Sequence, residues 1–573
     1  PEDFSFYEKI KVPPPTFCPE CRIIRRFLWR NERSLHHSVC RATNKRVISM
    51  FHPGTPVVVY ERNYWWSDNW DQLASGRDYD FSKPFFRQFR ELIELAPLPN
   101  LANTNVVNSE YGNHNADMKD CYLTYASFTN EGVHYSSGAV KSKESLDLFI
   151  AEGNEQCYDN VLCGSAFRVH FSYNIGGCLD SFFLDSCRDL KYSFGCANLR
   201  NKSYQFFNQS FSKEDYQQEI KKIDLGSYQT LTEYRKKFNE FIIGYPKRFA
   251  TLIKCVNVSG DQMQHAKNCK NCFDIYRDVE DSKFVVHALT LKDSYDGYGF
   301  GANAELLYEG IDSGLNGAKY KFTVFTHGCH DVQYTYACHS SSHLFGCVGL
   351  RNKSYCILNK QYTKEEYDKL VPKIIEHMGT LPYVDAKGRV YRYGEFFPPE
   401  LSPFSYNESI AQEYFPRTRE NIESSGFPWR IPEDKQYEIT KQATALPDHI
   451  KSVDDDILRE VIGCLHEGTC NHQCTFAFKI IQKELAFYRQ FNFPLPRLCP
   501  NCRHYGRLAQ RNPFKLWERK CQCSGIKSDN GVYINQISHF HGSEHCPNEF
   551  ETSYTPDRPE IVYCEQCYQA EVV

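Results

Sequence analysis

The sequence predicts a mainly β protein in which two tandem parallel β-solenoid units with capping helices are flanked by treble-clef or zinc-ribbon modules. A shift of 151 residues aligns one set of cysteines with another without a gap, namely Cys121, Cys178, Cys187 and Cys196 with Cys272, Cys329, Cys338 and Cys347. Within each copy, Cys recurs at steps of nine between short aromatic or β-branched stretches and turns rich in Asn, Asp, Ser and Gly. This period is typical of stacked coils of about 18–25 residues.

Most cysteines between residues 121 and 356 are predicted to fill the solenoid interior. Cys is small, apolar and commonly buried, so equivalent positions in successive coils form an internal column. A redox or metal role is the alternative. Cys269 and Cys272 are the Cys-x2-Cys pair of this region, and one such pair alone is a weak metal signal.

Apolar and aromatic residues at three- and four-residue spacing predict helices that cap the coil stacks, at residues 213–223, 231–243 and 364–377. Ser212 precedes Asp215 and Thr363 precedes Glu366 by three residues, which is the capping pattern of a helix N-terminus. Caps are needed because the last rung of a solenoid otherwise exposes unpaired backbone groups. Residues 85–95 have the same spacing and predict a helix that bridges the N-terminal module to the first solenoid.

The C-terminal region predicts two zinc sites. Cys-x2-Cys pairs place two thiolates at one edge of a tetrahedron, and a distant pair closes it around zinc with Zn–S bonds of about 2.3 Å. We assign one site to Cys470, Cys474, Cys499 and Cys502. We assign the other to Cys521, Cys523, Cys564 and Cys567, with His541, His545 and Cys546 as alternatives that replace Cys523 or cap an insertion. Disulfides are the alternative to zinc, and closed four-ligand sites are structural because no position is left for substrate.

The N-terminal region repeats this module with losses. Cys18 and Cys21 correspond to the Cys-x2-Cys pair at Cys499, but Glu61 and Tyr64 stand where the C-terminal copy has a second pair. Cys40 is therefore predicted to be an orphan thiol.

The partner pair of Cys18 and Cys21 is expected upstream of Pro1. Together with the lack of an initiating Met, this predicts that the true N-terminus is missing and leaves a targeting signal open. In the alternative, a site with Cys18, Cys21 and Cys40 is completed by histidines that are otherwise loop residues, namely His36, His37 and His52.

The chain of 573 residues divides into six predicted segments. They are a degenerate zinc module (1–70), a helical bridge (71–110), the first solenoid (111–245), the second solenoid (246–378), an extended connector (379–456) and the C-terminal zinc module (457–573). No run of 18 apolar residues occurs, so a membrane span is not expected. We expect a cytoplasmic protein of undefined oligomeric state.

Several specific motifs occur together along the chain: Phe487-Tyr488, Pro494-Leu-Pro496, Cys499-Pro-Asn-Cys502-Arg503, Pro559-Glu-Ile-Val562-Tyr563-Cys564, Trp65-Trp66-Ser67-Asp68 and the segment from Gly394 to Phe404. Through them the chain resembles, over nearly its whole length, an uncharacterised family of zinc-binding proteins from bacteria of the candidate phyla radiation. That family is sometimes filed under a CoA-transferase label, and it brings no established activity. The chain departs from the family pattern at Glu61 and Tyr64. It contains no nucleotide-binding loop or recognisable acyl-transfer nucleophile that supports a transferase.

Basic charge is concentrated on the two modules, although the net charge of the chain is −4. Residues 1–50 contain ten Lys and Arg against five Asp and Glu, and residues 475–530 contain eleven against three. Basic side chains neutralise phosphates and interleaved aromatic rings stack on bases, so we predict contacts with RNA or DNA. The candidate residues are Arg503, Arg507, Arg511, Arg519, Lys520, Arg22, Arg25, Arg26 and Arg30. The alternative is a basic face that balances the acidic solenoids.

Two further function classes stay open. A scaffold that binds only protein partners fits the long regular surfaces of solenoids. A polysaccharide-active enzyme fits by fold analogy, because parallel β-helices often carry such sites on a lateral face. Its candidate residues are Arg200, Lys202, Arg351, Lys353, Asp180 and Asp185, but no carboxylate pair repeats between the copies. We therefore assign no catalytic residue and favour a non-enzymatic, zinc-stabilised binding protein.

Overall fold

The computed structural model describes residues 2–431 and 437–573. It contains two compact units, and each unit is discontinuous in sequence. Unit 1 comprises Pro1–Ala102, Ala250–Ile431 and Phe514–Leu516, and unit 2 comprises Asn103–Phe249, Pro432–Pro513 and Trp517–Val573. Residues 432–436 of the predicted connector lie outside the described residues. The six predicted segments stay a prediction.

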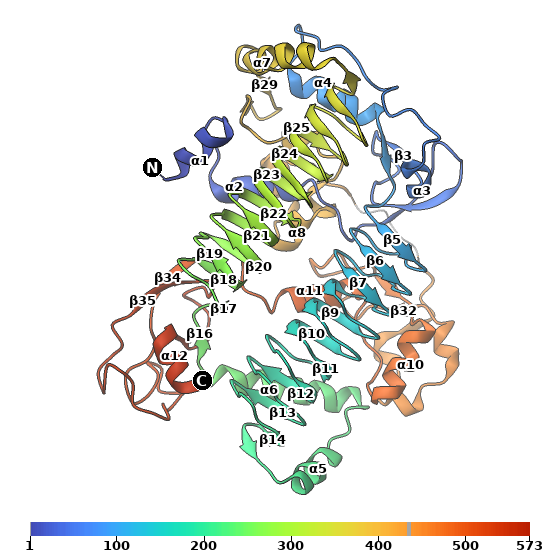
Figure 1. Cartoon of the computed structure of the whole chain (residues 1–573). Helices are drawn as coiled ribbons and strands as arrows, with labels where there is room; N and C mark the ends of the chain where they lie inside the picture. The colour runs from blue at the N-terminus through green and yellow to red at the C-terminus, as the bar shows by residue number, and fades with distance from the viewer. Residues whose placement is uncertain (1, 432–436) are drawn as a thin grey trace. The chain divides into compact units, whose positions relative to one another are not determined.

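Unit 2 contains an 11-stranded sheet whose neighbouring strands follow the chain order (Figure 1). Its strands are parallel except for the last pair. They are β5 (Thr104–Val107), β6 (Ala116–Lys119), β7 (Phe128–Glu131), β8 (Ser137–Val140), β9 (Leu146–Glu152), β10 (Tyr158–Gly164), β11 (Phe167–His170), β12 (Leu179–Asp185), β13 (Phe194–Ala197), β14 (Gln205–Phe206) and β15 (Gln209–Ser210).

Unit 1 contains a 12-stranded sheet of the same kind. Its strands are β17 (Leu252–Ile253), β18 (Gly260–Gln264), β19 (Ala266–Lys267), β20 (Cys272–Glu280), β21 (Lys283–Lys292), β22 (Tyr295–Phe300), β23 (Ala304–Gly314), β24 (Gly317–His327), β25 (His330–Tyr336), β26 (Ser342–Phe345), β27 (Ser354–Ile357) and β28 (Lys360–Gln361). The prediction of a mainly β protein built on a β-solenoid is confirmed.

The rung of the solenoid is shorter than the predicted 18–25 residues. In unit 2, Thr104, Ala116 and Phe128 are register partners on successive strands, so a rung takes 12 residues. In unit 1 a rung takes 12 residues, as from Lys283 to Tyr295, or 13, as from Ala304 to Gly317. The reason lies in the backbone, because a left-handed conformation recurs every third residue, for example at Asp117 (φ 55°) and Asp120 (φ 54°). Asn and Asp tolerate this conformation better than other L-residues. Each such residue turns a corner, and four corners close one rung.

Cysteines line the interior of both solenoids, as predicted. Cys187 is fully buried, and its Sγ donates hydrogen bonds to the carbonyl oxygens of Asp185 at 3.3 Å and Cys196 at 3.5 Å. Burial raises the pKa of Cys157 to about 12, which keeps that thiol protonated at neutral pH. Cys269 and Cys272 are buried in the same kind of column in unit 1. The predicted packing role of these cysteines is confirmed.

The predicted helices are present with small shifts at their ends. They are α4 (Phe85–Leu95), α5 (Lys213–Lys221), α6 (Tyr228–Ile243) and α7 (Lys364–Thr380). Thr363 and Glu366 form a capping box at the start of α7. The ring of Tyr367 lies 5.8 Å from that of Tyr355 on β27, so α7 covers the last rungs of unit 1. The ring of Phe238 on α6 lies 5.7 Å from that of Phe183 on β12 in unit 2.

The remaining elements form short sheets and helices around each solenoid. In unit 1 they are α1 (Glu2–Ile10), α2 (Pro19–Phe27), β1 (His36–Val39), β2 (Arg46–Ser49), β3 (Val58–Tyr60), α3 (Arg62–Trp66), β4 (Pro97–Pro99), β29 (Tyr383–Val384), β30 (Val390–Tyr391), η1 (Pro399–Leu401), η2 (Tyr406–Glu408), α8 (Ile410–Tyr414) and α9 (Arg419–Ser424). In unit 2 they are β16 (Lys247–Arg248), β31 (Lys441–Gln442), η3 (Ala443–Ala445), η4 (Ile450–Ser452), η5 (Asp455–Leu458), β32 (Ile462–Gly463), β33 (Ala477–Phe478), α10 (Gln482–Phe491), α11 (Pro500–Leu508), β34 (Trp517–Lys520), β35 (Glu549–Thr552), β36 (Val562–Tyr563) and α12 (Glu565–Val572). Among the described residues, no helix is both long enough and apolar enough to cross a bilayer.

Candidate metal centres

Two Cys-x2-Cys pairs of unit 2 begin helices. Cys499 is the N-cap of α11 and Cys564 is the N-cap of α12, and each Sγ accepts the backbone N–H three residues later at 3.5 Å. Pro500 at the first helical position has no N–H to leave unsatisfied and fixes the helical φ. The helix start therefore holds both sulfurs of a pair on one side, where the partial positive charge of the N-terminus favours thiolates.

The first centre gathers side chains around Cys502. Two groups of four ligand atoms each lie within 4.8 Å of one another: Cys464, Cys474, Cys499 and Cys502, and His466, Cys470, His472 and Cys502. The Sγ of Cys502 lies 3.8 Å from that of Cys464 and 3.6 Å from that of Cys470. Four sulfurs bound at about 2.3 Å around a tetrahedral zinc are about 3.8 Å apart. The spacing therefore fits a tetrahedral metal ion.

The second centre has the same form around Cys567. Its two groups are Cys521, Cys546, Cys564 and Cys567, and Cys523, His539, His541 and Cys567. The Sγ atoms of Cys546 and Cys564 lie 3.8 Å apart. The Nε2 of His541 lies 3.3 Å from the Sγ of Cys567, and the Nδ1 of His539 lies 3.3 Å from the Sγ of Cys523.

Hydrogen bonds favour the thiolate form at both centres. The backbone N–H of Cys499 donates to the Sγ of Cys464 at 3.3 Å, and that of Cys564 donates to the Sγ of Cys521 at 3.2 Å. Hydrogen bonding with Cys567 lowers the pKa of Cys523 to about 5, against the effect of burial. Thiolates are the form that binds metal.

The structure regroups the predicted ligands. Cys464 stands with Cys474, Cys499 and Cys502 where the sequence had suggested Cys470, which lies in the neighbouring group. Cys546 takes the place predicted for Cys523. These exchanges follow from the fold, because β32 and β33 pair as a hairpin and bring Cys464, directly after β32, to the start of α11.

Sequence reasoning missed several side chains of the two centres, namely Cys464, His466, His472 and His539. The signal was present as Cys and His at two-residue spacing, in 464–474 and again at 539–541. His545, by contrast, lies in no group of the described residues and pairs with Asp529 at 2.8 Å.

The N-terminal pair is placed differently. Cys18 is the N-cap of α2 and its Sγ accepts the N–H of Cys21 at 3.4 Å, but both residues are exposed. Among the described residues, no group of three or more metal-binding side chains includes either of them. Cys40 is buried, and its Sγ accepts the backbone N–H of Glu61 at 3.1 Å.

The histidines proposed to complete a site there have other places. The Nε2 of His36 lies 3.4 Å from a carboxylate oxygen of Glu408, and the Nδ1 of His52 accepts the N–H of Gly54. His37 is exposed. The described residues therefore assemble no site from Cys18, Cys21 and Cys40.

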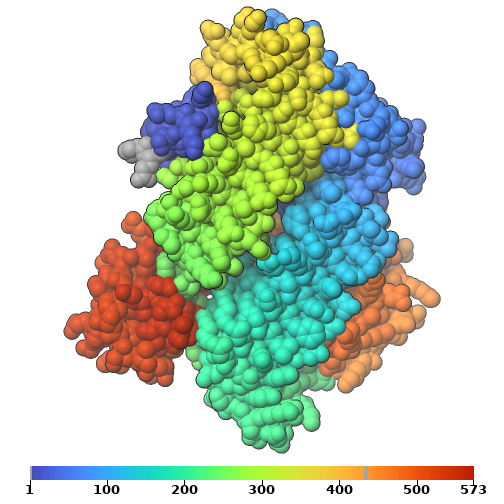
Figure 2. All heavy atoms as spheres, in the orientation of Figure 1, coloured from blue at the N-terminus to red at the C-terminus, as the bar shows by residue number. Residues whose placement is uncertain are grey.

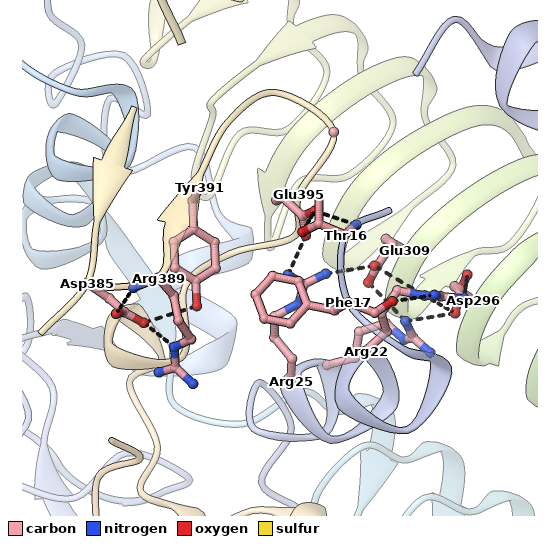
Figure 3. Close-up of polar contacts among 12 residues, drawn as sticks. Thr16, Phe17, Arg22, Arg25, Asp296, Glu309, Asp385, Arg389, Tyr391 and Glu395 are labelled. Atoms are coloured by element: carbon pink, nitrogen blue, oxygen red, sulfur yellow. Dashed lines mark hydrogen bonds and ion pairs between the residues drawn. The ribbon is translucent and has the colours of Figure 1, made fainter. Parts of the chain in front are cut away.

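The arginines of α2 are buried against two strands of the unit 1 solenoid (Figure 3). The guanidinium of Arg22 donates two hydrogen bonds of 3.0 Å to the carboxylate of Asp296 on β22. Arg25 and Arg26 donate to the carboxylate of Glu309 on β23 at 2.8 and 2.9 Å. Arg25 also donates to Glu395 at 2.8 Å.

The arginines of α11 repeat this arrangement on the unit 2 solenoid. Arg503 and Arg507 each lie 2.8 Å from the carboxylate of Asp147 on β9, and Arg507 lies 3.7 Å from Asp159 on β10. The side chain of Arg507 is 2% exposed. These carboxylates lie on neighbouring rungs, as Asp296 and Glu309 do in unit 1.

This burial concerns most of the residues predicted to contact nucleic acid, and the interface itself stays a prediction. Six of the nine candidate side chains are enclosed in such ion pairs and cannot reach a phosphate, namely Arg22, Arg25, Arg26, Arg30, Arg503 and Arg507. The number of Lys and Arg residues could not show this, because a basic helix has the same composition whether its side chains face solvent or buried carboxylates. Arg511 and Arg519 are half-buried and Lys520 is exposed beside Glu549.

Two of the side chains considered for polysaccharide chemistry have structural partners. Arg351 lies over the ring of Trp65 at 5.1 Å and donates to the carbonyl oxygen of Ser67. Asp185 accepts a hydrogen bond of 2.7 Å from the ammonium of Lys247.

An open groove of about 820 Å³ runs along one side of the unit 1 solenoid. Figure 2 shows this solenoid, coloured green to yellow, as a ridged and continuous surface. Charged side chains of the groove include Asp278, Glu280, Lys292 and Glu305, with His265 and His330 at the same side. Carboxylates outnumber ammonium groups there by three to one.

No protein-family model matches this chain, and no curated protein matches its sequence.

Proposed function

We propose that the protein is a non-enzymatic scaffold, stabilised by zinc in unit 2, that binds a basic, extended segment of a partner protein. The observation that carries this proposal is the burial of the module arginines in ion pairs with solenoid carboxylates. That pairing consumes most of the basic charge which would otherwise point to nucleic acid. The acidic groove of unit 1 is the surface that we propose for a partner.

Zinc is the metal proposed for the two centres. Their ligands are thiolate sulfurs and imidazole nitrogens at tetrahedral spacing, the donor set that zinc takes in structural sites. The buried Nδ1 atoms of His466 and His472 have no hydrogen-bond partner among the described residues, as expected of atoms that face a metal ion. Each centre is closed by protein ligands and has no position for a substrate.

The units also support the finer architecture. We infer that the chain is an internal duplication in which each copy joins one solenoid to one module. The support is the shared arrangement of α2 and α11, which both start at a Cys-x2-Cys pair and insert arginines between carboxylates of two successive rungs. The treble-clef or zinc-ribbon description of the modules and the resemblance to the candidate phyla radiation family remain predictions.

The partner is inferred from charge and shape. An extended chain can lie along a groove that crosses successive rungs, and Lys or Arg side chains at regular intervals would face Asp278, Glu280 and Glu305. Phosphates of RNA or DNA would be repelled by the same carboxylates. Rim charges of this kind govern the association rate and its salt dependence.

The test measures fluorescence anisotropy of three labelled probes across a salt titration: a Lys- and Arg-rich peptide, a Glu-rich peptide of equal length, and single-stranded RNA. We expect saturable binding of the basic peptide alone, weakening as salt increases. The triple variant Asp278→Asn, Glu280→Gln, Glu305→Gln should weaken that binding at least tenfold.

The matched control changes three exposed carboxylates of α7, with the same shift in net charge: Glu365→Gln, Asp368→Asn and Glu376→Gln. It should bind the basic peptide like the unaltered protein. Salt-sensitive binding of RNA that survives the groove variant and is lost in Arg511→Ala, Arg519→Ala, Lys520→Ala would overturn the proposal in favour of nucleic-acid binding.

A further inference from the structure

We propose that each centre of unit 2 is binuclear, with two metal ions bridged by one thiolate, Cys502 in the first centre and Cys567 in the second. The chain would then hold four metal ions instead of two. This inference rests on the proposed metal binding but not on the proposed partner.

The number of ligands is the first argument for two ions in each centre. Each centre has seven side chains, and in each centre these are five cysteines and two histidines. Two tetrahedral ions need eight coordination positions. Seven side chains provide eight positions only if one of them binds both ions. The residue common to both groups of four is Cys502 in one centre and Cys567 in the other.

The bridging position is the same in both centres. Cys502 and Cys567 are each the second cysteine of a Cys-x2-Cys pair and lie in the first turn of a helix. Each has neighbours on two sides, a set of three cysteines and a set of one cysteine with two histidines. A thiolate has more than one lone pair and can bind two zinc ions at once. Two separate stretches of sequence thus arrive at one ligand scheme.

The histidines of the second centre are oriented as ligands. The Nδ1 of His539 faces Cys523, and its Nε2 lies 2.9 Å from a carboxylate oxygen of Glu571. His541 faces Cys567 with Nε2 and has its Nδ1 2.7 Å from the carbonyl oxygen of Glu544. A carboxylate or carbonyl that accepts the second N–H is the usual support of a metal-bound imidazole.

A different observation indicates that the histidines of the first centre are also metal ligands. The Nδ1 atoms of His466 and His472 are buried without a hydrogen-bond partner among the described residues. Leaving a buried polar nitrogen unpaired is unfavourable. The ring of His472 stacks on that of Tyr505 at 5.3 Å, which fixes its orientation. A second ion beside Cys470 and Cys502 satisfies both nitrogens.

Charge also favours two ions per centre. A single divalent ion among five thiolates leaves a net charge of −3, whereas two ions reduce it to −1. Burying uncompensated charge is costly, so the second ion relieves repulsion among thiolates that lie within 4.8 Å of one another in each group of four ligands.

The first test is metal content measured by mass spectrometry on the full chain. We expect four zinc ions in the unaltered protein and three in Cys470→Ser or His539→Ala, which each remove a ligand of one outer ion. Cys502→Ser removes a ligand from two ions and should leave two. The control Cys187→Ser, in the solenoid interior, should keep four. Two ions in the unaltered protein would refute the binuclear centres while leaving zinc binding intact.

The second test detects the bridge itself without a variant. The protein loaded with cadmium-113 should give four cadmium NMR signals, two typical of four sulfur ligands and two of mixed sulfur and nitrogen ligands. Coupling through a shared sulfur should join them in two pairs. Four signals without such coupling, or two signals only, would overturn the proposal.

Discussion

Helices α2 and α11 each dock arginines on the solenoid of their own unit, but within the described part of the chain only α11 of the two begins at a cluster of candidate metal ligands. Both begin at a cysteine N-cap, both have Pro at the first helical position, and both insert arginines between carboxylates of two neighbouring rungs. Around Cys499 and Cys502 the thiolates are buried and surrounded by ligands. Around Cys18 and Cys21 they are exposed.

The difference teaches that the arginine contacts, and not the metal ligands, define how a module docks on its solenoid. In unit 1 the docked helix is further held by aromatic packing, where Phe27 lies 4.7 Å from Tyr298 and Trp29 lies 4.9 Å from Phe397 between ring centroids. In unit 2 the segments around α10 and α11 combine the candidate metal ligands with buried apolar side chains, such as Leu485, Phe487 and Phe493.

Metal removal should produce the largest difference in stability between the two units. Structural zinc contributes on the order of 10 kcal/mol to small domains. Chelation, or Cys499→Ser, should therefore unfold the segment around α10 and α11 while α2 stays protected. Hydrogen exchange resolved by segment measures both helices in one experiment. Equal loss of protection in α2 would contradict the comparison.

Breaking the arginine contacts should affect both units. Arg26→Met removes one of the arginine partners of Asp296 and Glu309 and leaves Arg22 and Arg25. Arg507→Met removes one of the two arginine partners of Asp147 and leaves Arg503. Leaving a buried charge without any partner costs about 3–5 kcal/mol, and the arginines that remain make this figure an upper bound here.

The consequences for the helices should differ in this second experiment. In unit 1 the variant should free α2, whereas in unit 2 the metal ligands should keep α11 folded. Urea unfolding gives the energies, and hydrogen exchange reports the helices. Loss of α11 in zinc-loaded Arg507→Met would show that the metal alone does not hold it.

The stability of unit 1 should depend on pH through the carboxyl group of Glu413 on α8. Burial raises the pKa of Glu413 to about 7, although Arg33 and Arg30 oppose this. The folded-state pKa is above the unfolded value of 4.5, so the stabilising effect of the protonated form is complete below pH 4.5 and is lost as pH rises to about 7. The loss amounts to about 3 kcal/mol at pH 8. Glu413→Gln should flatten the dependence of unfolding free energy between pH 5 and 8, and an unchanged slope would exclude Glu413 as its source.

The smallest effect is expected at the exposed pair of unit 1. Ser is a better N-cap than Cys, so Cys18→Ser should change the unfolding free energy by only about 0.5 kcal/mol. The matching change Cys499→Ser is the most damaging of the series. A large effect of Cys18→Ser, with loss of metal, would show that the N-terminal pair binds an ion after all.

Elements specified by local sequence could be predicted. Helix α4 was predicted with its observed ends, and the caps at Ser212 and Thr363 were read from three-residue spacing. The stacked coils followed from the period of the cysteines. The predicted coil length was wrong because the side chains of residues such as Leu123 and Ala126 do not indicate a left-handed backbone conformation. That conformation is imposed by the rungs on either side.

Features that depend on distant contacts could not be predicted. Arg503 and Asp147 are separated by 356 residues in the sequence, and no local motif indicates that they form an ion pair. The choice of Cys464 over Cys470 likewise depends on a hairpin that only the folded chain defines. Ligand types were recognisable from composition, but their grouping required three-dimensional placement.

The 12-residue rung and the long reach of the docking contacts have a consequence for synthesis of the chain. Each rung of β5–β15 needs only its neighbours, so that solenoid can form while translation continues. Its carboxylate at Asp147 must wait for Arg503, which is made about 20–70 s later at 5–20 residues per second. In unit 1 the order is reversed, because Arg22 precedes Asp296. One nascent solenoid therefore waits with unpaired carboxylates, while the other finds its arginines already made.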